Sequence, residues 1–187
     1  MNGEREIWGN FGSCNVAGFT KEKISFFRSV LDGVEVASLQ ETHGEQKDSK
    51  SRVMRLGFKK GIFSLHKRAS RGSALLWKDP FELQGDAWTD LEGRIAAGIL
   101  KSREPGSPRI LFVSVYAPNV DPSPQSQSQY ISFLITLEHM LSTMTARGVD
   151  SIVMMGDFNL LCDPELDSLS ASPKIFKILL VNLQEVF

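Results

Sequence analysis

Short runs in which apolar residues dominate, or alternate with polar ones, predict a chain rich in strands. The segment GNFGSCNVAG (9–18) has the pattern of a strand that ends near Asn15, and VEVASLQ (34–40) is a second strand that runs into Glu41. Further strands are predicted at FKKGIFSLHK (58–67), SALLW (73–77), RIAAGIL (94–100), RILFVSVY (109–116) and SIVMMGD (151–157). Turn-forming and charged pieces separate the middle runs, so those strands are expected to be mostly antiparallel.

Helical spacing of apolar residues is found near the two ends of the chain. Residues 20–33 predict a helix that Thr20 can cap and Gly33 can stop, with apolar residues on one face at Ile24, Phe27, Val30 and Leu31. A second helix is predicted from about Tyr130 to Ala146, after a polar loop at 117–129, and a third is predicted to be opened by Ser172 and Pro173.

This order of elements favours an α+β fold over a strictly alternating, doubly wound one. A block of strands lies between helices, and each sheet must bury an apolar face, so two packed sheets with helices outside are the expected core. No linker or internal repeat divides the chain. We therefore expect a leader at residues 1–10 and one domain at 11–187.

Composition narrows the classes of function. The 187 residues carry 21 basic and 22 acidic side chains, a formal net charge of -1, so the total charge gives no general attraction to nucleic acid or membrane. Cys14 and Cys162 cannot make a disulfide framework, the start MNGEREIWGN lacks a signal-peptide pattern, and no apolar run approaches about 20 residues. We expect an intracellular protein, nuclear or cytoplasmic, with no membrane association and no obligate protein partner.

Polar groups follow four of the predicted strands at the point where each strand ends. They are Asn15, Glu41, Tyr116 with Asn119, and Asp157 with Asn159. Strands that run side by side bring such groups to one rim. Carboxylate and amide oxygens are the donors that suit Mg²⁺, Ca²⁺ or Mn²⁺, and no cysteine or histidine pair has zinc-site spacing. A magnesium ion held by one or two carboxylates suits phosphate chemistry.

The motifs SCNVAGF, SLQETH, RGSALLW, EGR, SVYAPN and MGDFN, in this order, resemble the endonuclease/exonuclease/phosphatase superfamily. They most closely resemble the apurinic-endonuclease-like domain of LINE-type retrotransposon proteins, and LLCDPELD (160–167) looks like that branch too. The resemblance implies a four-layer α-β-β-α sandwich of two mainly antiparallel sheets. It also implies Mg²⁺-dependent (or Mn²⁺-dependent) hydrolysis of a DNA phosphodiester, here a nick that primes reverse transcription.

The resemblance also implies roles for individual residues. Glu41 resembles the principal metal ligand, with Asn15 as its amide neighbour. Asp157 resembles the residue that orients or deprotonates the attacking water, and Asn159 the one that holds the scissile phosphate. Tyr116 resembles a tyrosine that hydrogen-bonds the phosphate in the transition state.

Other residues are left with two interpretations each. Asn119 can shape the rim or serve only in a turn. His43 can contact phosphate or be solvated, and Arg94 can meet DNA backbone or pair with Glu92. The basic residues Lys59, Lys60, Lys67, Arg68 and Arg71 can form a phosphate-binding cluster or a solvated loop. Plainer interpretations also exist for the rim: Glu41 and Asp157 as loop acids, and Tyr116 as a core aromatic.

One departure from the superfamily pattern concerns the end of the sequence. The pattern continues with further strands and a Ser-Asp-His motif, whereas this sequence stops at VNLQEVF. His66 and His139, in a predicted strand and a predicted helix, cannot substitute. We therefore expect a sandwich incomplete at its C-terminus and an impaired DNA-nicking domain. The alternatives are a non-catalytic remnant that binds DNA or metal weakly, and a superfamily phosphatase acting on a lipid or inositol phosphate.

Overall fold

A computed structural model describes residues 9–18, 21–43, 51, 53–67, 71–159 and 177–182, and of residues 21, 22 and 177–182 it describes the backbone alone. The first sheet has the strand order β1-β2-β4-β3. Its strands are β1 (Phe11–Asn15), β2 (Val36–Gln40), β3 (Lys60–Ser64) and β4 (Ser73–Trp77). β1 and β2 are parallel, and the other two pairs are antiparallel.

The second sheet has the order β10-β9-β8-β7-β5, with β6 also paired to β7. Its strands are β5 (Phe81–Leu83), β6 (Trp88–Thr89), β7 (Ile95–Ser102), β8 (Arg109–Tyr116), β9 (Ser151–Asp157) and β10 (Lys177–Asn182). β8 and β9 are parallel, and the remaining pairs are antiparallel. The prediction of mainly antiparallel sheets is confirmed for the described strands.

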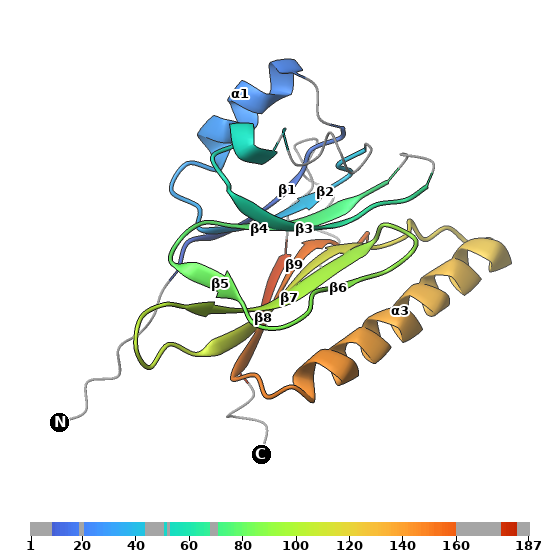
Figure 1. Cartoon of the computed structure of the whole chain (residues 1–187). Coiled ribbons are helices and arrows are strands. Elements are labelled where there is room, and N and C mark those ends of the chain that lie inside the picture. The colour runs from blue at the N-terminus through green and yellow to red at the C-terminus, as the bar shows by residue number, and fades with distance from the viewer. Residues whose placement is uncertain are drawn as a thin grey trace.

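The two sheets pack face to face, with helix α1 (Lys21–Val30) outside the first and helix α3 (Pro124–Thr145) outside the second (Figure 1). Three apolar clusters fill the spaces between these four layers. Ile24, Phe27 and Leu31 of α1 pack on the first sheet, and Phe133, Leu137, Met140 and Met144 of α3 pack on the second. A third cluster lies between the sheets and includes Leu75, Trp77, Phe112 and Met155. The predicted α+β sandwich is confirmed.

Strict alternation along the strands produces these layers. In β8, Leu111, Val113 and Val115 face α3, whereas Ile110 and Phe112 face the other sheet. A strand buried on both faces reads as a nearly continuous apolar run, which is why RILFVSVY gave so clear a signal. The bounds predicted for β4, β8 and β9 agree with the structure.

Two sequence predictions about helices are wrong. The helix expected from Tyr130 begins at Pro124, because Ser123 caps it by accepting a hydrogen bond from the amide of Ser126 (3.2 Å). The helix expected after Ser172 is not found at residues 177–182, which form β10 and pair antiparallel with β9. Thr20, Ser172 and Pro173 lie outside the described residues. At Gly33 the left-handed backbone (φ 74°) that was expected to stop the first helix is present.

Candidate active site

Two parallel strand pairs bring four strand ends to one edge of the sandwich. In the first sheet, Asn15 lies opposite Gln40, so Asn15 and Glu41 leave their strands side by side. In the second sheet, Tyr116 lies opposite Asp157. The hydroxyl of Tyr116 interacts with the charges of both Glu41 and Asp157, which joins the ends of the two sheets in one strand-end site.

The carboxylate of Glu41 is held by its neighbours in the first sheet. The amide nitrogen of Asn15 donates to Glu41 Oε1 at 2.7 Å, and the backbone N–H of Ala17 donates to Asn15 Oδ1 at 3.0 Å. The carbonyl of Glu41 accepts a hydrogen bond from Gly18 at 2.7 Å. His43 Nε2 lies 4.0 Å from Glu41 Oε2, so one carboxylate oxygen faces Asn15 and the other faces His43.

Left-handed backbone is concentrated in the loops of this site. Among the described non-glycine residues, positive φ values occur at Ala17 (43°), Glu41 (54°), His43 (34°) and Asn159 (49°). In a continued strand, Glu41 would follow Leu39 onto the face that packs against α1. The left-handed turn instead directs its carboxylate to Asn15. Such strain costs about 1 to 3 kcal/mol per residue and clusters at functional sites.

Tyr116 is a hydrogen-bond donor at the centre of the site. Burial is the main cause that raises the pKa of its phenol above the usual value, and the charge of Glu41 and a hydrogen bond to Glu41 raise it further. Asp157 adds to the same shift, while Arg94 opposes it. The phenol therefore keeps its proton at neutral pH, and it can offer that proton to an incoming anionic oxygen.

Asp157 and Asn159 form a compact unit with the end of β8. Asp157 is 6% exposed, and its carbonyl accepts from the amide of Ala117 at 2.8 Å. Its Oδ1 accepts from the backbone N–H of Asn159 at 3.0 Å. The side-chain amide of Asn159 donates to the carbonyl of Ala117 at 2.6 Å. These contacts fix the Asp157 carboxylate beside Tyr116.

Arg94 lies against Tyr116 at the end of β8 and is 9% exposed. Its Nη1 donates to the carbonyl of Tyr116 at 3.0 Å, and its guanidinium carbon lies 5.5 Å from the centre of the Tyr116 ring. Asp90 Oδ1 fixes the backbone, because it accepts from the amides of Arg94 and Ile95 at 2.8 Å each. Burial, and then the nearby charge of Arg71, lower the pKa of Arg94. The pairing with Glu92 that was considered for Arg94 is made by Arg71, at 2.9 Å.

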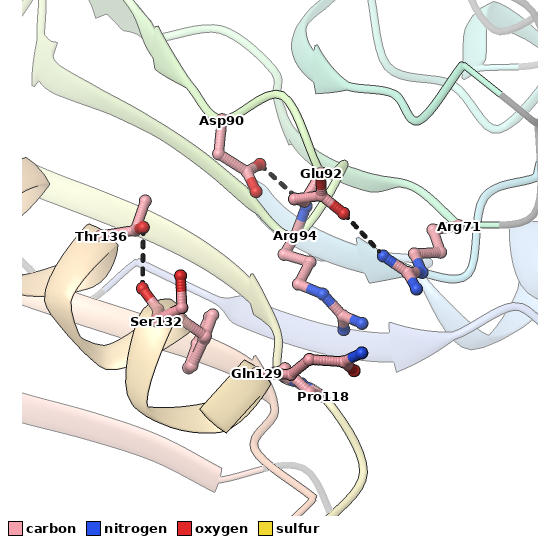
Figure 2. Close-up of a pocket in the computed structure, with 9 residues that line it drawn as sticks. Arg71, Asp90, Glu92, Arg94, Pro118, Gln129, Ser132 and Thr136 are labelled. Atoms are coloured by element: carbon pink, nitrogen blue, oxygen red, sulfur yellow. Dashed lines mark hydrogen bonds and ion pairs between the residues drawn. The ribbon is translucent and has the colours of Figure 1, made fainter. Parts of the chain in front are cut away.

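A polar cleft opens beside Tyr116 and continues along the N-terminal half of α3. It consists of two hollows of about 440 and 300 Å³ that share Arg71, Arg94, Pro118 and Gln129. Figure 2 shows the guanidinium groups of Arg71 and Arg94 directed toward this shared space. Asn119 is exposed and lines the larger hollow, where its carbonyl accepts from Ser126 Oγ at 3.0 Å. Arg94 offers a cation to an anionic ligand here, whereas Arg71 pairs with Glu92, and Asp90, Glu92 and Asp121 also line the two hollows.

The basic cluster predicted from the sequence is not one cluster in the structure. Lys60 lies opposite Trp77 at one end of the β3–β4 hairpin, where it is 3.6 Å from Asp79. Arg71 lies at the other end, next to the pair formed by Ser64 and Ser73. Arg68, another member of that proposed cluster, lies outside the described residues. Cys162, one of the two cysteines, also lies outside them. Arg71 alone of the described members lines the cleft.

The donor set can be tested against a divalent metal ion. Within the described ranges, no three histidine, cysteine, aspartate or glutamate side chains gather in a metal-binding group. Glu41 supplies a carboxylate, whose Oε1 accepts from the Asn15 amide nitrogen, and Asn15 supplies an amide oxygen, which also accepts from the Ala17 amide; both are hard oxygen donors. Mg²⁺ commonly binds proteins through one or two carboxylates and keeps several waters, so this donor chemistry fits Mg²⁺ or Mn²⁺.

Comparison with known proteins gives a fold but no sequence family. No family model and no curated protein matches the chain. Among solved structures, it is similar to the catalytic domain of Xenopus laevis APE2, with 20% identity and a TM-score of 0.61 over 81% of this chain and 59% of that one. It is also similar to the AP endonuclease LMAP from Leishmania major, with 22% identity and a TM-score of 0.60 over 81% of this chain and 55% of that one. The Neisseria 3′ phosphatase NExo, bound to a product DNA hairpin, is similar with 18% identity and a TM-score of 0.58 over 83% of this chain and 61% of that one.

This chain has the endonuclease/exonuclease/phosphatase fold. At identities of 17 to 22% among the five AP endonuclease and exonuclease structures, the likeness concerns the fold alone. The chain spans less than two-thirds of the length of each of these structures. The described helices include none that is long and apolar enough to cross a membrane.

Sequence reasoning missed two contributors to the site. Asp90 organises the turn that carries Arg94, and the EGR motif gave no sign of it because the acid lies upstream of the motif. Gln129 lines both hollows because α3 begins earlier than expected. The pair Ser123-Pro124, a capping residue followed by proline at the first helical position, is the signal that could have located that helix start.

Proposed function

We propose that this protein hydrolyses phosphodiester bonds in DNA at the strand-end site. The observation that carries the proposal is the meeting of Glu41, Tyr116 and Asp157 at one edge, contributed by both sheets, with Glu41 in left-handed backbone. A buried acid, a protonated phenol and the guanidinium of Arg94 are groups that an attacking water and a phosphate require. The fold shared with solved AP endonucleases supports the same reaction class.

In the proposed reaction, Asp157 accepts a proton from the attacking water while that water is aimed at phosphorus. Asn159 extends the site beside Asp157 and contacts the scissile phosphate. The phenol of Tyr116 donates a hydrogen bond to a phosphoryl oxygen, because a tyrosine phenol is protonated at neutral pH and burial raises the pKa of this one further. These groups preorganise charge stabilisation where negative charge develops.

Glu41 and Asn15 are the residues that would hold a divalent metal ion, Mg²⁺ or Mn²⁺. When bound, such an ion neutralises charge on the phosphoryl and leaving oxygens. The left-handed backbone of Glu41 and its bond to Asn15 hold the carboxylate in place before any ligand arrives. His43, on the other side of that carboxylate, is proposed to contact phosphate.

The cleft beside Tyr116 is proposed to bind the DNA backbone. Arg94 is buried and already orients the carbonyl of Tyr116, so its remaining donors lie close to the reacting phosphate. Asn119 and Arg71 extend the contact along the larger hollow. Local cations of this kind bind phosphates even when the net charge of the protein is near zero.

At the finer level, we propose that the reaction is a single-strand nick of the kind that primes reverse transcription in LINE-type elements. The motif order of the sequence supports this, although LLCDPELD lies outside the described residues. Such priming requires a 3′-hydroxyl end. The impairment expected from the sequence stays a prediction, as does an intracellular location. The non-catalytic remnant and a superfamily phosphatase acting on a lipid or inositol phosphate remain alternatives, and the substrate decides between them.

The test is relaxation of supercoiled plasmid with Mg²⁺ by the full chain and by two isosteric variants, Glu41→Gln and Asp157→Asn. Each has a control on the same strand at the opposite end. Glu35 precedes β2 and accepts from the amide of Asn10 (3.2 Å), and Asp150 precedes β9 and accepts from the amide of Arg109 (2.7 Å). Losing a positioned acid-base group typically costs about 100- to 10,000-fold.

We expect the chain and its Glu35→Gln and Asp150→Asn variants to nick the plasmid, and the two site variants to lose that activity while remaining folded. Release of inorganic phosphate from a lipid phosphate or an inositol phosphate without plasmid nicking would favour the phosphatase. Plasmid binding with no cleavage would favour the remnant. Equal nicking by Asp157→Asn and Asp150→Asn would remove Asp157 from the mechanism.

A further inference from the structure

Beneath the strand-end site, a group of buried polar side chains joins the two sheets. Ser38 Oγ of β2 lies 2.7 Å from Ser114 Oγ of β8 and 3.1 Å from the carbonyl of Met155 in β9. Ser73 Oγ of β4 lies 2.8 Å from Ser114 Oγ and 3.1 Å from its carbonyl. Gln40 Nε2 donates to Ser38 Oγ at 2.5 Å and to Ser13 Oγ at 3.2 Å. We call Ser38, Gln40, Ser73 and Ser114 the polar seam.

The seam occupies a fixed level between the sheets because side chains two residues apart share a strand face. On β8, the face toward the first sheet carries Phe112, then Ser114, then Tyr116. On β9, the corresponding row has Met155 followed by Asp157. From the middle of the sandwich toward the strand-end site, the residues between the sheets therefore change from apolar (Phe112, Met155) to the polar seam and then to the site residues Tyr116 and Asp157.

Every member of the seam is solvent-inaccessible: Ser38, Gln40, Ser73 and Ser114 are each 0% exposed. Their polar atoms nevertheless satisfy one another. Gln40 donates to Ser38, Ser38 donates to the Ser114 hydroxyl or to the Met155 carbonyl, and Ser73 donates to the Ser114 carbonyl. Buried polar networks that are fully satisfied specify a unique packing, whereas purely apolar faces can slide with little change in contact.

Directional contacts across the interface matter here because the site is divided between the sheets. Glu41 follows Gln40 in the first sheet, whereas Tyr116 and Asp157 end strands of the second. No backbone hydrogen bond of the two sheets links these strands, since each ladder is internal to one sheet. The seam contains side-chain hydrogen bonds between the sheets one level below the site.

We infer that the polar seam is a positioning device: it fixes the register of one sheet against the other and so places Glu41 relative to Tyr116 and Asp157. The inference rests on the proposed function for its catalytic consequence only. The structural part concerns the placement of Glu41 whatever the site does. Ser38 and Ser114 are thus positioning residues that touch no substrate.

Ser38→Ala and Ser114→Ala each remove one hydroxyl from the seam, and Ser107→Ala is the matched control. Ser107 is also a buried serine, 5% exposed, and it lies in the turn between β7 and β8, at the end of those strands far from the site. Its hydroxyl donates to the carbonyl of Glu104 at 2.6 Å and touches no member of the seam. Ser73→Ala reaches Ser114 from a third strand and replaces any seam variant that does not fold. All variants are compared at equal folded concentration.

The first readout needs no activity. Amide ¹H–¹⁵N shifts are measured for Glu41 and Asn159 in the full chain. We expect Ser114→Ala to move the Glu41 amide, which belongs to the other sheet, and Ser38→Ala to move that of Asn159. Ser107→Ala should move neither. An unchanged Glu41 amide in Ser114→Ala would overturn the inference even if the chain proves to be a nuclease.

The second readout is the nicking rate. Since misplacement of about 1 Å can cost on the order of 100-fold, we expect kcat to fall about 10- to 100-fold in Ser38→Ala and Ser114→Ala with KM nearly unchanged. Ser107→Ala should keep its kcat. An equal loss in Ser107→Ala, or full kcat in both seam variants, would refute positioning. A wild-type chain without nicking activity would refute the proposed function alone, and the amide shifts would then decide the inference.

Discussion

Replacement of Glu41 by glycine should stabilise the protein relative to replacement by alanine. Glu41 has φ 54°, in the left-handed region that side chains with a Cβ atom rarely adopt. Both substitutions remove the carboxylate and its bond to Asn15, so their difference isolates the backbone. This comparison tests whether the site stores strain in the turn that redirects Glu41.

The magnitude follows from two opposing effects. A residue with a Cβ atom pays about 1 to 2 kcal/mol in the left-handed region. Glycine in a regular element is less stable than alanine by roughly 0.5 to 1 kcal/mol, since it loses more conformational freedom on folding. The net expectation is that Glu41→Gly is more stable than Glu41→Ala by about 0.8 kcal/mol, the middle of a range of about 0 to 1.5 kcal/mol.

Urea unfolding of both variants, followed by circular dichroism, measures this difference. The control is the same pair at Glu138, which is exposed within α3 and has ordinary helical backbone. There, glycine should be less stable than alanine by about 1 kcal/mol. The two pairs should thus differ in sign. Alanine more stable than glycine at position 41, as is expected at position 138, would show that the turn at Glu41 is not strained.

Three further predictions concern separate parts of the molecule. Ser123→Ala should reduce the free energy of unfolding, measured by urea denaturation, by about 1 kcal/mol through loss of the α3 cap. Burial raises the pKa of the Cys14 thiol to about 11, so its alkylation at pH 8, followed by mass spectrometry, should be on the order of 100-fold slower than for a free cysteine and should keep rising with pH beyond 9. Arg94→Ala should weaken DNA binding and lower the slope of log K against log salt by about 0.9, measured by fluorescence anisotropy.

The strands that meet at the site were predictable because their apolar signal is unambiguous. RILFVSVY and SIVMMGD are buried on both faces, so any register keeps them apolar, and the polar residues that end them are read directly from the sequence. The parallel pairing of β8 with β9, and of β1 with β2, then brings those ends together.

The errors have equally local causes. The first turns of α3 are PQSQSQ, in which Ser126 is the only buried residue, so helical spacing of apolar residues was missing and only the cap marked the start. KILLVN is too short for its apolar residues to distinguish a helix from a strand, and pairing with β9 decides for β10. The turn at Glu41 depends on a backbone angle that residue types do not reveal. Neighbours in sequence, such as Lys60 and Arg71, are separated when a hairpin places them at opposite ends.

The most direct test of phosphodiester hydrolysis at this site is product analysis in H₂¹⁸O. A DNA duplex is incubated with the full chain and Mg²⁺, and the cleaved strands are analysed by mass spectrometry. The account predicts one ¹⁸O atom in the phosphate at the 5′ end of the downstream strand, a 3′-hydroxyl on the upstream strand, and loss of both products in Asp157→Asn but not in Asp150→Asn. Absence of cleavage, phosphate without the label, or labelled product formed equally by Asp157→Asn would contradict it.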